Sequence, residues 1–243
     1  METFHNVFQC GAQEVETSAI LAMAGHWREK YFKNDNPIVL ELGCGRGEYT
    51  VGLAERNPHK NYIGIDIKGA RMWAGAKHAE LAGMTNVAFL RTNIEMLCHF
   101  FTTDEVDEIW ITFPDPHMKT VTQRLTSTYL MERYRQVLRP NGIIHLKTDS
   151  PFLYTYTDAM VIENNYPIVV NTNNLYEANA SPKIEEARCL QTHYEKQWLD
   201  RGLTIKYIAW KLPQMLSLIE PDIEIEKDDY RSYGRNYVST TNN

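Results

Sequence analysis

The chain has 243 residues, of which 43% are hydrophobic and 23% charged, as is usual for a globular protein. No stretch is long and apolar enough for a membrane span, and Met1 to Asn6 lack the basic flank and apolar core of a secretory signal. The net charge of −6 also argues against a protein that binds nucleic acid through a generally basic surface.

Cysteine usage points to a reducing compartment. Cys10, Cys44, Cys98 and Cys189 are scattered, without the paired spacing of a metal site or a disulfide framework. We therefore expect reduced thiols, no bound metal and a cytoplasmic protein.

Along the chain, β and α signals alternate after an initial amphipathic segment, 15–32, that predicts a helix. A regular alternation of this kind predicts a parallel sheet with helices on both faces, and ligands then bind beyond the carboxyl ends of the strands. The predicted strands are 38–42, 61–66, 87–91, 106–112, 143–147, 168–170 and 204–212, and the later helices are 48–56, 69–82, 94–101, 125–138, 152–163 and 190–199.

No linker or repeat interrupts this pattern, so we expect one domain over residues 1–212. Residues 213–243 differ in composition and form an acidic C-terminal extension. We interpret it as a solvated tail in preference to a functional flap. Its acids within ten residues are Glu220, Asp222, Glu224, Glu226, Asp228 and Asp229.

The most informative stretch is the glycine-rich turn that follows the apolar strand 38–42. Gly43, Gly45 and Gly47 allow a sharp turn and a close approach of the backbone to a ligand. The third glycine comes one residue too early for a dinucleotide-binding turn, and Glu41 stands before the first. A carboxylate suits a cationic ligand end, and S-adenosylmethionine carries an ammonium and a sulfonium but no phosphate.

Polar residues also end the next two strands. Asp66 follows the glycine turn by about twenty residues, the distance at which a carboxylate accepts hydrogen bonds from both ribose hydroxyls. Asn93 follows the strand after that, where its amide could reach an adenine edge. Either residue could instead be the N-cap of the following helix.

The fourth strand runs into Phe113-Pro114-Asp115-Pro116, where two prolines fix a non-helical loop around Asp115 at the ligand crevice. A plain Asx-Pro turn is the alternative. Lys119 begins a local run of cations that suits phosphates, although a solvated helix face would look the same. The other members of this run are Arg124, Arg133, Arg135 and Arg139.

Two later motifs place carboxylates at the same level of the predicted sheet. Asp149 ends the fifth strand in Lys147-Thr148-Asp149, and Thr192 and Glu195 open a late helix. The alternatives are a strand-end turn for Asp149 and a capping box for the Thr192–Glu195 pair.

In this order, these motifs resemble those of the bacterial tRNA (guanine-N7)-methyltransferases over about residues 12–212. The resemblance implies a single class I methyltransferase domain with a seven-stranded, mostly parallel sheet and an antiparallel last strand. It implies S-adenosylmethionine as cofactor and a variable-loop guanine of tRNA as substrate, with Asp115 as the catalytic position. The implied cofactor residues are Glu41, Asp66, Asn93 and Asp115, and the implied substrate residues are Lys119, Asp149 and Thr192 to Glu195.

One departure concerns the segment after Asp115. Members of that family usually continue with Trp-Pro and a dense run of cations, whereas residues 117–124 here are much less basic. This bears on tRNA affinity more than on chemistry. Two alternatives therefore stay open: a methyltransferase for another substrate, and a non-catalytic RNA-binding module on the same fold.

Overall fold

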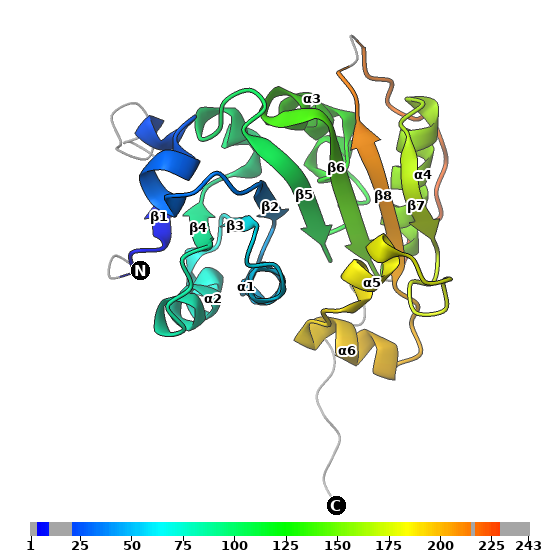
Figure 1. Ribbon diagram of the computed structural model, residues 1–243. Helices are drawn as coiled ribbons and strands as arrows, with labels where there is room; N and C mark the ends of the chain where they lie inside the picture. Colours follow the sequence, from blue (N-terminus) through cyan, green and yellow to red (C-terminus); the bar gives the residue numbers. More distant parts are fainter. Residues whose placement is uncertain (1–3, 10–20, 215–216, 229–243) are drawn as a thin grey trace, which may run out of the picture.

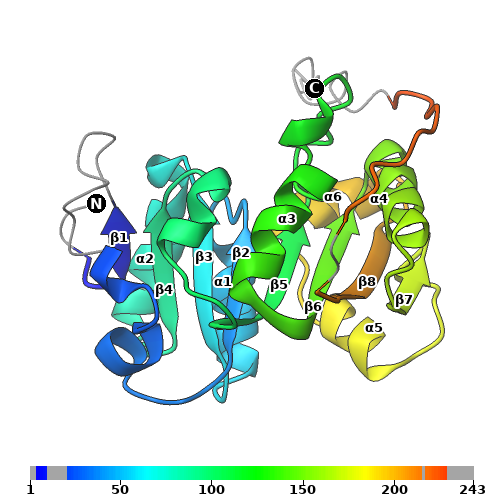
Figure 2. The same ribbon diagram turned by 90° about the horizontal axis from the view of Figure 1, so that it is seen from above.

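The computed structural model describes residues 4–9, 21–214 and 217–228. Within them, eight strands form one sheet in the order β1-β4-β3-β2-β5-β6-β8-β7, which Figure 2 shows from edge to edge. Pairing is parallel from β1 to β6, and β8 is antiparallel to both of its neighbours. The strands are β1 (Val7–Gln9), β2 (Ile38–Leu42), β3 (Asn61–Asp66), β4 (Val87–Arg91), β5 (Val106–Thr112), β6 (Leu138–Thr148), β7 (Ile168–Thr172) and β8 (Lys206–Leu212).

Helices cover both faces of the sheet (Figure 1), and each face has its own hydrophobic core. One core packs against α1 (Glu48–Arg56), α2 (Gly69–Leu81) and α5 (Pro182–Arg188), with α6 (His193–Asp200) at its margin. The other packs against η2 (Trp27–Phe32), η3 (Ile94–His99), α3 (Thr128–Val137) and α4 (Pro151–Glu163). The predicted mostly parallel α/β sheet with an antiparallel last strand is confirmed.

The sheet has eight strands rather than the predicted seven. The additional strand, β1, pairs with β4 at the edge of the sheet, with Val7 opposite Phe89. Three residues are too few to give a period-two signal, so the sequence pattern does not reveal this strand.

The predicted helix over 15–32 is wrong within the described residues. It is broken into a 3-10 turn, η1 (Leu21–Met23), and the π-helical η2, and residues 15–20 lie outside the described part. Gly25, between the two pieces, has a φ of +78° and its amide donates to Glu105. Helix α5 was not predicted, because its short sequence follows an Asn-rich stretch.

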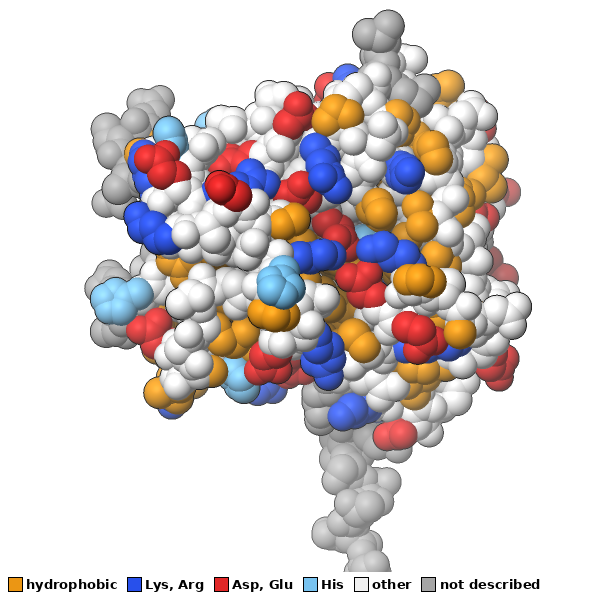
Figure 3. All heavy atoms as spheres, in the orientation of Figure 1, with side chains coloured by type: hydrophobic (Ala, Val, Ile, Leu, Met, Phe, Trp, Pro, Cys, Tyr) orange, Lys and Arg blue, Asp and Glu red, His pale blue; other side chains and the backbone are white. Residues whose placement is uncertain are grey.

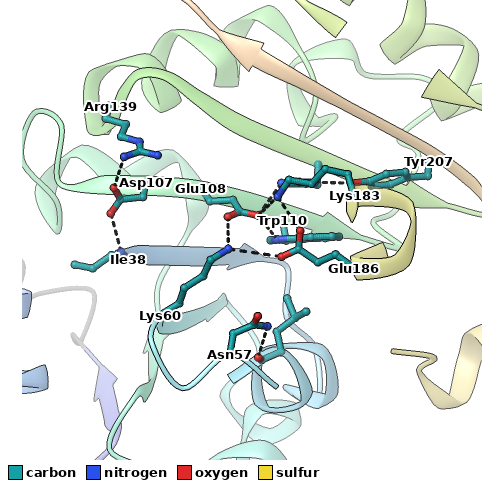
Figure 4. Close-up of polar contacts among 12 residues, drawn as sticks. Ile38, Asn57, Lys60, Asp107, Glu108, Trp110, Arg139, Lys183, Glu186 and Tyr207 are labelled. Atoms are coloured by element: carbon teal, nitrogen blue, oxygen red, sulfur yellow. Dashed lines mark hydrogen bonds and ion pairs between the residues drawn. The ribbon is translucent and has the colours of Figure 1, made fainter. Parts of the chain in front are cut away.

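Charged residues pin the amino ends of the central strands (Figure 4). Asp107 accepts from the Ile38 amide at 2.7 Å and lies 3.1 Å from Arg139. The Glu108 carboxylate forms an ion pair with Lys60 Nζ at 2.8 Å and lies 2.8 Å from Nε2 of the fully buried His145. This network lies at the amino ends of the strands, away from the carboxyl ends where a ligand is expected, so it stabilises the scaffold.

The described part of the acidic extension, residues 217–228, runs beside α4 in both ribbon views (Figures 1 and 2). Glu220 accepts a hydrogen bond from the Tyr156 hydroxyl, and Asp228 accepts one from Ser150 Oγ at 2.6 Å. Two carboxylates of this part are thus bound to helix residues, whereas Asp222, Glu224 and Glu226 are exposed, as the interpretation as a solvated tail predicts. Sequence composition could not reveal the contacts, since both partners lie more than sixty residues earlier in the chain.

Among residues 4–9, 21–214 and 217–228, no helix combines the length and the apolar character that crossing a membrane requires.

Candidate active site

Two adjoining hollows lie at the carboxyl ends of β2 to β5. The main hollow has a volume of about 560 Å³ and the side hollow about 300 Å³, within the range of small-molecule sites. They share Gly43, Gly45, Arg71 and Phe113. The main hollow is lined among others by Glu41, Tyr49, Trp73, Thr192 and Tyr194, and the side hollow by Asp66, Lys68, Asn93, Asp115 and Leu125.

The glycine turn has the conformation that its sequence predicts. Gly43, Gly45 and Gly47 all have φ between +55° and +76°, a region that residues with a Cβ rarely adopt. A Cβ at Gly45 would meet no atom within 4 Å, so the backbone there faces open space in both hollows. A Cβ at Gly47 would lie 2.6 Å from the Phe89 ring. The turn therefore packs closely on one side and is accessible on the other.

Glu41 is a buried carboxylate at the floor of the main hollow. Thr50 donates to one of its oxygens and Thr112 to the other, the latter at 2.7 Å. Burial raises the pKa of Glu41 to about 7, and the nearby Asp66 adds to this shift. A cationic ligand group in the hollow would favour the ionised form, so the site suits an ammonium.

Asp66 and Asn93 both reach the side hollow, as their positions at the strand ends predict. Asp66 accepts from the Gly45 amide at 2.9 Å and from the Lys68 amide at 2.7 Å, which ties the glycine turn to β3. Asn93 is the N-cap of η3, and its side-chain oxygen accepts from the Glu95 amide at 3.2 Å. The N-cap alternative thus holds for Asn93, and its side-chain nitrogen remains available as a donor toward a ligand.

Asp115 also lines the side hollow, so the Phe113-Pro-Asp-Pro loop does meet the glycine turn in space. Its carboxylate is exposed and accepts from the His117 amide at 3.2 Å. Phe113 and His117, on either side of the loop, have φ of +49° and +42°. Left-handed backbone at residues with a Cβ is unfavourable, so the surrounding contacts must hold this loop.

Asp149 lies just beyond β6 and is 6% exposed. Its Oδ1 has no hydrogen-bond partner within the described part of the chain. Burial raises the pKa of Asp149 to about 6, and the Asp228 carboxylate contributes to the rise. A buried acceptor without a partner is costly, so a ligand donor would satisfy it, although Asp149 lines neither of the two hollows.

Glu195 is placed differently from Asp149. It is fully buried, its Oε1 lies 2.8 Å from Lys147 Nζ, and it accepts from the Tyr176 hydroxyl at 2.6 Å. Thr192 accepts from the Glu195 amide at 3.3 Å and so caps α6, while also lining the main hollow. The capping interpretation holds for Thr192, and the ion pair favours a supporting place for Glu195 over direct contact with a base.

The predicted basic face does not form. Lys119 is exposed and lines neither hollow, whereas Arg124 is only 7% exposed. Arg135 pairs with Glu132, and Arg139 pairs with Asp107 at the opposite edge of the sheet. Figure 3 shows cations and carboxylates intermingled over the face it presents. Side-chain partners that are distant in sequence explain why the cation run does not become one surface.

Several residues of the main hollow were not predicted, Trp73 among them. Trp73 is 45% exposed on α2, and Tyr194, which belongs to the predicted segment Thr192 to Glu195, is 58% exposed on α6. Large exposed aromatic side chains at the carboxyl edge of a parallel sheet are a signal that the predicted helices could have supplied. The Lys147–Glu195 ion pair, in contrast, depends on a contact that no local pattern encodes.

Comparison with solved structures agrees with the fold. The 16S rRNA methyltransferase KamB superposes with a TM-score of 0.55, covering 84% of this chain and 94% of that one at 15% identity. A structure described as an antibiotic-related methyltransferase gives 0.53 at 17% identity, covering 83% of this chain and 94% of that one. At these identities the similarity concerns the fold alone.

Sequence comparison is more specific. Residues 35–208 match the family described as "Putative methyltransferase". Proteins named tRNA (guanine-N(7)-)-methyltransferase are 57% identical in Bacteroides fragilis, over 97% of this chain and 92% of that protein, and 57% identical in Porphyromonas gingivalis, over 97% and 96%. The predicted family and its cofactor, S-adenosylmethionine, are therefore confirmed, and this chain belongs to the bacterial tRNA (guanine-N7)-methyltransferase family of methyltransferases.

Proposed function

We propose that this protein transfers a methyl group from S-adenosylmethionine to N7 of a guanine in the variable loop of tRNA. The observation that carries the proposal is the junction of the two hollows, where the glycine turn and Glu41 meet the loop of Asp115. Full-length similarity to proteins named for this reaction supports it. A tRNA substrate would also support a cytoplasmic location, which we include in the proposal.

The residues of the two hollows fit S-adenosylmethionine. Gly45 leaves space for a close ligand, Glu41 suits the ammonium, Asp66 suits the ribose hydroxyls and Asn93 the adenine edge. Bound there, S-adenosylmethionine supplies an electrophilic methyl group on a sulfonium. Gly43 shapes the same turn.

Cofactor binding should depend strongly on Asp66. Asp66→Ala removes a charged acceptor and also releases the glycine turn, so we expect S-adenosylmethionine affinity to fall by about 1.5–3 kcal/mol. Titration calorimetry measures this directly. Asp35→Ala, an exposed carboxylate before β2, is the control and should bind normally. Equal affinity in the Asp66 and Asp35 variants would refute the assignment.

Cofactor binding should also depend on pH through Glu41. With its pKa raised to about 7 in the free protein, Glu41 is largely protonated at pH 5.5 and must ionise to pair with an ammonium. Affinity should therefore rise from pH 5.5 to 7, with proton release that calorimetry detects in buffers of different ionisation enthalpy. Glu41→Gln should bind more weakly and lose this proton release. An unchanged pH dependence in that variant would exclude Glu41 as the source.

The chemistry at guanine N7 requires alignment and charge stabilisation. N7 has a lone pair and no proton, so the protein needs no general base there. The purine becomes cationic as N7 gains the methyl group, and a carboxylate near the ring stabilises that charge. Asp115, on its fixed loop, is suited to this task. Lys119 and Thr192 are suited to contacts with the RNA.

We assign the selection of guanine over adenine to Asp149. Guanine offers hydrogen-bond donors at N1 and at the N2 amine, which a carboxylate accepts, while adenine presents an acceptor at N1. Each carboxylate has one buried oxygen without a described partner, Oδ1 of Asp149 and Oε2 of Glu195. The ion pair with Lys147 already neutralises Glu195, so we assign the contact with the base to Asp149.

Inosine, which lacks the N2 amine but keeps N7, tests this selection. Replacing the target guanine by inosine should lower kcat/KM of the wild type, by an amount equivalent to about 1–3 kcal/mol of transition-state stabilisation. The penalty should largely disappear in Asp149→Ala and persist in Glu195→Ala. Equal wild-type rates for guanine and inosine would rule out carboxylate recognition of the amine.

The function as a whole is tested by incubating the protein with labelled S-adenosylmethionine and bulk tRNA. Digestion and chromatography should recover the label in 7-methylguanosine, and mapping should locate it in the variable loop. Label in another nucleoside, or none in tRNA, would overturn the proposal.

A further inference from the structure

Arg124 holds the loop that carries Asp115. Its Nε donates to the His117 carbonyl and its NH2 to the Met118 carbonyl, each at 3.3 Å. These carbonyls lie at the end of the loop where His117 adopts its left-handed conformation. At the other end, the Phe113 amide donates to the Lys147 carbonyl at 2.8 Å. The loop is thus fastened on both sides of Asp115.

The guanidinium is itself held by two aromatic rings of α4. It lies 4.8 Å from the ring centroid of Phe152 and 4.3 Å from that of Tyr156, and the residue is 7% exposed. Stacked, buried guanidinium groups of this kind are fixed in orientation, which an RNA-phosphate contact at the surface would not require.

The acidic extension fastens these rings. Glu220 accepts from the Tyr156 hydroxyl and from the amide and hydroxyl of Thr128, which opens α3. Asp228 accepts from Ser150 Oγ at 2.6 Å and from the Phe152 amide at 3.3 Å at the start of α4. Two carboxylates of one segment therefore cap the N-termini of α3 and α4, the helix that carries both rings.

We propose that Arg124 is a positioning residue for Asp115, and that residues 217–228 act as a strap that keeps Arg124 in place through Glu220 and Tyr156. The inference rests on the proposed function for its catalytic consequence. Its structural part, an ordered loop that depends on Arg124 and on the strap, stands without it.

Arg124→Lys is the decisive variant, because lysine keeps the charge but has neither the planar fork nor the stacking surface. We expect kcat for tRNA methylation to fall about tenfold or more, with KM for tRNA and S-adenosylmethionine within about twofold. Arg133→Lys, on α3 with its guanidinium over Tyr129, is the matched control and should retain activity. An Arg124→Lys protein with normal kcat overturns the proposal, and so does one whose defect is confined to KM for tRNA.

Hydrogen exchange separates this inference from the proposed function, since it needs no turnover. Amides of residues 113–119 should exchange faster in Arg124→Lys than in the wild type, well below the melting temperature. If the wild type fails to methylate tRNA but the loop still loosens, only the proposed function fails. Unchanged exchange in the loop would overturn the inference, whatever the activity.

Tyr156→Phe tests the strap, because it retains the ring under Arg124 and removes only the hydroxyl that binds Glu220. We expect a smaller loss of kcat and faster exchange in both 113–119 and 217–228, and Glu220→Ala should act in the same direction. Faster turnover in either variant would mean that the segment inhibits the enzyme, and unchanged exchange in 113–119 would mean that it does not support the loop.

Discussion

Asp115→Asn is expected to lower kcat about a hundredfold or more while KM for tRNA changes only a few-fold. The amide keeps the size of the side chain and can still accept from the His117 amide, so the loop should retain its shape. What is lost is the negative charge beside a purine that becomes cationic. Single-turnover methylation at saturating tRNA and cofactor measures this loss without contributions from product release.

Asp35→Asn removes the same charge from an exposed site outside the two hollows and should leave kcat unchanged. A raised KM with near-normal kcat in Asp115→Asn would instead indicate a role in binding alone. Asp115→Glu carries the charge one methylene further out. Its kcat should lie between those of the wild type and Asp115→Asn if the position of the charge matters.

Lys147→Met is expected to lower the free energy of unfolding by about 3–5 kcal/mol, because it leaves Glu195 buried without its cation. Lys147 also donates to the carbonyls of Ala187 and Leu190 at 2.7 and 3.0 Å, so one ammonium joins β6 to the junction of α5 and α6. Urea denaturation measures the loss. S-adenosylmethionine affinity should fall as well, since Thr192 on this junction lines the main hollow.

Two further variants serve as controls for the effect of Lys147→Met. Lys211→Met, on the exposed side of β8, removes a lysine at little cost. Lys147→Met combined with Glu195→Leu should recover much of the lost stability, since no buried charge remains unpaired. If the double variant is as unstable as Lys147→Met alone, the bonds to the two carbonyls, and not the ion pair, account for the stabilisation.

The parts of the site that could be predicted from sequence are those encoded by local geometry. Gly43, Gly45 and Asp66 belong to short strand–turn–helix units, and parallel strands bring their ends to one edge. The spacing alone therefore placed Asp66, Asn93 and Asp115 together. Thr192 could be assigned both to a helix cap and to the crevice, and it occupies both places.

The parts that could not be predicted depend on side chains meeting across long sequence separations. Arg124 was predicted to contact phosphate because it belongs to a run of cations. In the structure its guanidinium is instead enclosed by two rings of α4 and two backbone carbonyls. Glu195 had the position of a substrate residue, but Lys147 neutralises it. The acidity of residues 220–228 suggested hydration, but Glu220 and Asp228 bind donors at the N-termini of two helices. Charge in a sequence shows what needs a partner and not where that partner lies.

The strap has a consequence for synthesis. Glu220 and Thr128 are separated by 92 positions in the chain, and Asp228 and Ser150 by 78. Because a nascent polypeptide leaves the ribosome from its N-terminus, α3 and α4 emerge well before the carboxylates that cap them. The sheet up to β6 can assemble in the meantime, but the support of Arg124 by the strap is completed only when translation has passed residue 228. A released chain truncated just before residue 220 should accordingly bind S-adenosylmethionine but methylate tRNA more slowly than the full-length protein.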